Sequence, residues 1–102
     1  MNEQQPKDPE EQMRERGETV VLLLKKNLGH ARFRYFLAER SVEGAPMYTV
    51  YADYRDEAIH TASAILDLTP LRETAEGFCR LLAKMLVTPL SLEDIYEDLL
   101  TP

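Results

Sequence analysis

The sequence predicts an α+β protein in which a four-stranded antiparallel meander sheet precedes two helices that cover one of its faces. Three observations predict this class. Residues 19–68 contain stretches of alternating apolar and polar side chains separated by turn-forming residues, as expected of paired strands. From Thr69 onward the apolar residues recur every three or four positions, as in an amphipathic helix. A chain of 102 residues also suits a single domain with one core.

Residues 1–17 are expected to form a disordered N-terminal tail, and residues 18–102 a single folded domain. The tail contains two prolines and many charged residues, and its large apolar side chains are Met1 and Met13. Such a segment buries too little apolar surface to offset the entropy lost when a chain becomes ordered. We therefore expect the tail to be mobile and dispensable for folding.

The stretch VVLLLKK at residues 20–26 predicts the first strand. A helix ending at Gly29, or a segment folded over the sheet, is the alternative for residues 18–28. Gly17 and the β-branched run that starts at Thr19 weaken the helical alternative. Because side chains alternate between the two faces of a strand, the five apolar residues of this stretch cannot all face the helices.

The second and third strands show the clearest alternation, in RFRYFLAER (residues 32–40) and MYTVYADYR (residues 47–55). The residues expected to face the helices are Phe33, Tyr35, Leu37, Tyr48, Val50, Ala52 and Tyr54. Turns are expected at residues 27–30, 43–46 and 55–58, and AIHTASAILDL at residues 58–68 is the fourth strand. Short turns of this kind join consecutive neighbours, so a simple meander results.

The C-terminal part predicts two helices. The apolar face expected of the first consists of Leu71, Ala75, Phe78, Leu82 and Met85. This helix should end before Pro89, and the second should begin at Ser91, whose hydroxyl suits a helix start. Both helices are expected on the same face of the sheet.

The stretches FRYFLAERS, YTVYADY and VTPLSLEDIYEDLL resemble a family of small bacterial proteins of unknown function. In that family a short antiparallel sheet precedes a helix and an acidic tail that contains Thr-Pro. The resemblance covers roughly residues 31–100, and the charged N-terminal tail lies outside it. Because the family has no assigned activity, the resemblance implies no catalytic or binding residues.

Charge and composition narrow the possible partners. The 18 acidic and 12 basic residues give a net charge of −6, which argues against nucleic acid as a general partner. The chain has no apolar stretch of the length that a signal peptide or a membrane span needs, so we expect a cytoplasmic protein without membrane contact. Its single cysteine, Cys79, fits a reducing compartment.

The sequence contains little that suggests catalysis. His30 and His60 have no cysteine or second histidine at metal-ligand spacing. Cys79 has no base beside it in the sequence, and the acidic residues at 93–98 alternate with leucines on a predicted helix. We therefore expect a non-catalytic protein that has no catalytic residues and binds neither cofactor nor metal.

The remaining feature is an outward-facing apolar strip. We expect an interface with a second copy of the chain, in a symmetric homodimer, or with another protein, because monomers seldom leave such a strip exposed. The contact is expected through this face of the sheet or through the edge of the first strand. Its residues are Val21, Leu23, Phe36 and Tyr51, rimmed by Lys25, Arg32 and Arg34. The alternative is a small domain that binds RNA or another single strand by stacking bases on the aromatic residues beside the arginines.

Overall fold

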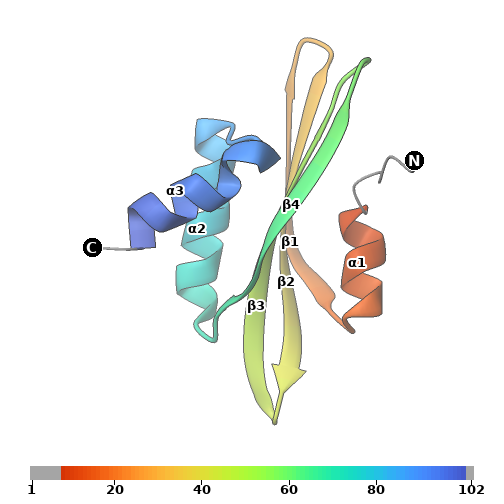
Figure 1. Ribbon diagram of the computed structural model, residues 1–102. Helices are drawn as coiled ribbons and strands as arrows, with labels where there is room; N and C mark the ends of the chain where they lie inside the picture. Colours follow the sequence, from red (N-terminus) through yellow and green to blue (C-terminus); the bar gives the residue numbers. More distant parts are fainter. Residues whose placement is uncertain (1–7, 101–102) are drawn as a thin grey trace, which may run out of the picture.

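The computed structural model describes residues 8–100 and contains one sheet with helices on both of its faces (Figure 1). The strands, which lie in the sheet in chain order, are β1 (Thr19–Leu28), β2 (Ala31–Val42), β3 (Ala45–Arg55) and β4 (His60–Thr69). The helices are α1 (Pro9–Glu15), α2 (Arg72–Met85), the short 3-10 helix η1 (Pro89–Ser91) and α3 (Leu92–Leu100). The antiparallel meander and its two C-terminal helices are confirmed.

The helices divide the sheet into two different faces. Helices α2 and α3 cover what we call the inner face, and α1 lies against the opposite, outer face (Figure 1). Short turns keep the strands in order. The turn between β2 and β3 consists of Glu43 and Gly44, both with positive φ (53° and 83°), as tight hairpins require.

The inner core forms between β2, β3 and α2. Tyr35, Leu37 and Val50 are fully buried against Leu82 and its neighbours on α2. Tyr35 also donates a hydrogen bond from its hydroxyl to the carbonyl of Val87, at 2.7 Å, so its polar end is satisfied inside the core.

The apolar face of α2 is slightly rotated from the expected one. Phe78 and Leu82 are buried as expected, but Leu71 and Met85 are 63% and 53% exposed. Both stand at the ends of the helix, Leu71 as its N-cap and Met85 as its last residue. Cys79 takes part in the core instead, with its side chain fully buried.

A bulge in β1 explains where its apolar residues go. The pairing with β2 shifts register between Val20 and Leu22, and Val21, Leu22 and Leu24 all pack toward the inner core. The strand assignment for this stretch is confirmed, but the outward position expected for Val21 is wrong. A bulge adds one residue and breaks strict alternation, which a sequence pattern does not reveal.

Residues 9–17 do not form the expected disordered tail; residues 1–7 lie outside the described part of the chain. Asp8 caps α1 by accepting a hydrogen bond from the amide of Glu10 at 3.1 Å, and Pro9 occupies the first turn. Met13 is 2% exposed and packs with Phe36 and Tyr51 on the outer face. The expectation failed because two buried side chains, Pro9 and Met13, together with ion pairs, are enough to order this short helix on the sheet.

This helix also corrects the picture of an exposed aromatic strip. Phe36 and Tyr51 lie on the outer face as the alternation predicts, but they are 2% and 1% exposed. Together with Met13 and Ala38 they form a second, smaller core. Part of the outer face that the sequence predicted to be an interface is therefore covered by α1 of the same chain.

The substitution Met13→Ala should reduce the free energy of unfolding by roughly 2–5 kcal/mol, the range for emptying a buried methionine site. Met85→Ala is the matched control and should cost much less, because Met85 is half exposed. Urea unfolding followed by circular dichroism measures both. Equal, small losses would show that α1 contributes nothing to the fold.

Candidate functional site

The outer face has a covered half and an open half. Helix α1 covers the half near the start of β1, and the β1–β2 and β3–β4 hairpins extend beyond it (Figure 1). The open half forms a groove with a volume of about 940 Å³. We call it the hairpin groove; its lining residues are Asp8, Glu10, Lys25, Asn27, Gly29, His30, Arg32, Phe33, Arg34, Asp53, Arg55, Asp56 and Glu57.

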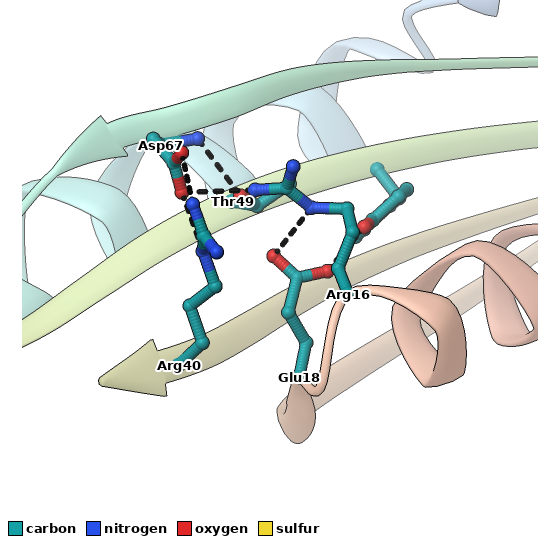
Figure 2. A network of polar contacts seen from close by, with 6 residues as sticks. Arg16, Glu18, Arg40, Thr49 and Asp67 are labelled. Atoms are coloured by element: carbon teal, nitrogen blue, oxygen red, sulfur yellow. Dashed lines mark hydrogen bonds and ion pairs between the residues drawn. The ribbon is translucent and has the colours of Figure 1, made fainter. Parts of the chain in front are cut away.

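Charged groups anchor the N-terminal segment to the covered half (Figure 2). Asp67 on β4 accepts hydrogen bonds from Arg16, at 2.9 Å, and from Arg40 on β2, at 2.7 Å and 3.2 Å. Arg16 also contacts Glu18 through its Nε, at 3.2 Å. We call Arg16, Glu18, Arg40 and Asp67 the anchor cluster, because it joins the end of α1 to two strands.

The backbone at Asp67 adapts to this role. Its φ is +49°, a left-handed conformation that Asp tolerates better than most residues, and its amide donates to the Thr49 hydroxyl at 2.8 Å. The hydrogen bond from Arg40 lowers the pKa of Asp67, burial opposes this, and the hydrogen bond from Arg16 adds to the lowering. The carboxylate is therefore stabilised in its charged form.

Glu18 joins the anchor cluster to the small outer core. Its side chain is fully buried and accepts a hydrogen bond from the hydroxyl of Tyr51. Burial, and then this hydrogen bond, raise the pKa of Tyr51, so the phenol stays neutral and remains a donor. A buried carboxylate needs such partners, and Arg16 supplies the countercharge.

In the hairpin groove a second carboxylate is held from two sides. Asp53 is 3% exposed and lies between Arg34, at 3.0 Å from its Nε, and His60, at 2.6 Å from its Nε2. Arg34 also binds Glu10 of α1 at 3.0 Å and lies over the ring of Phe36, with its guanidinium carbon 5.0 Å from the ring centroid. Arg34 thus connects the groove to α1.

The same contacts shift the pKa of Arg34. Burial lowers it, but the hydrogen bond to Asp53, followed by the one to Glu10, raises it above its ordinary value. Its guanidinium is therefore permanently charged at the boundary between the covered and open halves.

These groups can orient charge, and the described residues that line the groove include no hydroxyl or thiol side chain. A carboxylate beside an imidazole is the orienting half of a hydrolytic triad, but Ser, Thr and Cys are absent from the groove lining. Cys79 lies on the other side of the sheet, and burial raises the pKa of its thiol to about 12. Across residues 8–100, no group of three or more His, Cys, Asp or Glu side chains is placed to hold a metal ion.

The structure separates the residues that the sequence predicted to form one strip. Leu23, Lys25, Arg32 and Arg34 stand on the outer face of β1 and β2, where Lys25 lies directly opposite Arg34. Val21 points to the inner core, and Phe36 and Tyr51 lie beneath α1, as described above. Sequence reasoning missed the roles of Asp53, His60 and Asp67, whose partners depend on the strand register.

The comparisons with known proteins identify a family. A model for DUF6514, described as a family of unknown function, matches residues 18–102. This chain belongs to the DUF6514 family. No curated protein and no solved structure matches it.

The match places most of the candidate site inside the DUF6514 domain. It includes the four strands, α2 and α3, and therefore Arg34, Asp53, His60 and Asp67. Helix α1 and Arg16 precede the matched residues. Within the described part of this DUF6514 protein, no helix has the length and apolar character needed to cross a membrane.

The substitution Asp67→Asn tests the anchor cluster, since asparagine tolerates the left-handed backbone and removes the charge. Because the pKa of Asp67 is lowered in the folded state, its stabilising effect is present above the ordinary carboxyl pKa of about 3.9 and is lost as the pH falls through the lowered value. We expect Tm at pH 7 to fall by about 4–8 °C, which corresponds to the loss of about 1 kcal/mol from ion pairs that are partly exposed to solvent.

The Tm values of the wild-type protein and of the Asp67→Asn variant should converge at low pH, where Asp67 is protonated. Asp98→Asn, on the exposed surface of α3, is the control and should leave Tm unchanged at both pH values. Differential scanning calorimetry measures the difference. A Tm gap that stays constant as the pH falls would contradict the charge-based account.

The buried thiol of Cys79 gives an independent test of how α2 packs on the sheet. In the native protein Cys79 should react with Ellman's reagent much more slowly than a free thiol, because it is fully buried and its pKa is raised to about 12. In denaturant, one equivalent should react at once. Rapid reaction under native conditions would mean that α2 does not protect the thiol.

Proposed function

We propose that this protein is a non-catalytic protein-interaction module that associates with a second copy of itself through the edge strand β1. The supporting observation is that β1 ends the sheet, so along residues 8–100 no other strand pairs with its outer edge. An edge of ten residues presents a row of backbone donors and acceptors that another strand can pair with.

The side chains of β1 support pairing. Val20 and Leu23 stand on the outer face and are 43% and 38% exposed. Leu22 and Leu24, on the inner face, are only partly buried at the edge of the main core. A neighbouring strand would extend both apolar surfaces and remove this exposed area from water.

The charges of β1 favour a second copy as the partner. In an antiparallel pair of β1 strands centred on Leu23, Leu24 faces Leu22 of the other copy, and both lysines lie opposite the bulged start of the other strand, where Val20 and Val21 stand. No lysine then lies opposite another, and the lysine stems cover apolar residues. The result is a symmetric dimer with one continuous sheet.

The other edge strand is less suited to pairing. β4 contacts η1 and α3 and is kinked near Asp67, where the backbone is left-handed. Bulges and covering elements of this kind are how edge strands avoid association. The proposal therefore commits to β1.

The alternative, a domain that binds single-stranded nucleic acid, loses its stacking surface. Phe36 and Tyr51, the aromatic residues on the outer face, are 2% and 1% exposed beneath α1. Base stacking needs an accessible ring face. The net charge of −6 also opposes a polyanion.

Sedimentation equilibrium at micromolar concentration should give a mass twice that of the 11.7 kDa chain. Leu23→Lys should shift the equilibrium to monomer, because two charges would meet at the centre of the paired strands. Leu90→Lys is the matched control, since Leu90 is 80% exposed on η1, and should leave the dimer intact.

Circular dichroism of each variant checks that the fold is retained. A wild-type protein that sediments as a monomer, or a folded Leu23→Lys variant that remains dimeric, would contradict pairing through β1.

A further inference from the structure

A row of basic side chains crosses the open half of the outer face. The strand register places Arg32 of β2 directly opposite Arg55 of β3, and Arg55 directly opposite His60 of β4. Lys25 of β1 stands in the next row, opposite Arg34. The arginines are exposed and line the hairpin groove.

The positive charges of these two rows, one with Arg34 and one with Arg32 and Arg55, are neutralised to different extents. In one, Arg34 is directly opposite Asp53 and forms an ion pair with it. In the other, Arg32 and Arg55 oppose each other, an arrangement that destabilises a sheet. Within residues 8–100 neither arginine has an acidic partner, and Arg55 has His60 Nδ1 as a neighbour at 3.4 Å.

The acidic residues that line the same groove are already engaged. Asp53 binds Arg34 and His60, and Asp8 and Glu10 also pair with Arg34.

Of the two acidic residues in the β3–β4 turn, Asp56 is engaged as well, and Glu57 is largely exposed to solvent. Asp56 accepts hydrogen bonds from the Tyr54 hydroxyl, at 2.6 Å, and from the amides of its own turn, and Glu57 lies 3.6 Å from His30. The charges of Arg32 and Arg55 are thus left without a countercharge in a chain that has an excess of acidic residues.

We infer that the hairpin groove binds a small phosphate-type oxyanion, such as a phosphomonoester, between Arg32 and Arg55. Guanidinium groups offer paired N–H donors that match the oxygens of a phosphate, and an anion between them would turn repulsion into attraction. His60, held by Asp53 through its Nε2, has its Nδ1 3.4 Å from Arg55 and so lies beside that arginine on the side toward β4.

The groove also indicates the size of the ligand. Acidic side chains bound it at both ends, with Asp8 and Glu10 beside α1 and Asp56 and Glu57 at the β3–β4 turn. A long polyanion would run from the arginines onto these acids, whereas a single phosphate group would not. We therefore commit to a small ligand and not to nucleic acid.

The test uses the full chain and inorganic phosphate, titrated at constant ionic strength and followed by NMR of backbone amides and arginine Nε–H groups. We expect saturable shifts centred on Arg32, Arg55 and their strand neighbours. Arg32→Gln and Arg55→Gln should each weaken the apparent affinity about tenfold, since each removes a charged hydrogen-bond donor. Arg80→Gln, on the exposed surface of α2, should leave it unchanged.

A thermal readout separates loss of binding from loss of fold. Without phosphate, Arg32→Gln should melt at the wild-type temperature or above it, because like-charge repulsion is relieved. Phosphate should raise Tm of the wild-type protein and not that of the variant. Arg55 lies two strands from β1, so Arg55→Gln should leave self-association unaffected.

Two further titrations, with other phosphate-containing ligands, identify the source of the phosphate group. A nucleoside monophosphate should produce the same pattern of shifts as inorganic phosphate, with equal or higher affinity. A single-stranded oligonucleotide should bind no better per phosphate. Shifts that do not saturate, that follow Arg80 as much as Arg32, or that favour the oligonucleotide would each overturn the inference.

Discussion

The Asp67 carboxylate is the charge on which the two-sided arrangement depends. It binds Arg40 within the sheet and Arg16 beyond the end of α1, so one group joins the fourth strand, the second strand and the N-terminal segment. Without that link, α1 would be retained mainly by Met13 and by the contacts of Arg34 with Asp8 and Glu10. A seven-residue helix is too short to be stable alone, so it persists because the sheet holds it.

The parts of this fold that follow from periodicity were predictable. Alternation in β2 and β3 is strict, so the inner positions of Tyr35 and Val50 could be assigned from sequence, as could the helical burial of Phe78 and Leu82. Helix α1 was not predicted because its seven residues contain a single large apolar side chain, and one side chain makes no periodic pattern. Its order comes from tertiary contacts with residues far along the chain, and composition does not report these.

The candidate site was less predictable for a related reason. That Arg34 would face outward was clear, but its pairing with Asp53, and the opposition of Arg32 to Arg55, depend on strand register. A shift of the strand register by one residue would give each of these side chains a different partner. The bulge near Val20 had the same effect on β1, where it turned Val21 inward. In β2 and β3 the sequence therefore identified which side chains share a face, and the structure identified which of them meet.

Because α1 is tethered to the sheet, it competes with any other molecule that binds the surface beneath it. Residues 16–18 connect the helix to β1, so α1 acts as a ligand for the covered half of the outer face at an effective concentration of about millimolar or higher. Any other helix or peptide that docks on Phe36 and Tyr51 must first displace it, and its apparent affinity falls by the fraction of molecules in which that surface is free. This competing helix lies in the same chain, before the residues that the DUF6514 model matches.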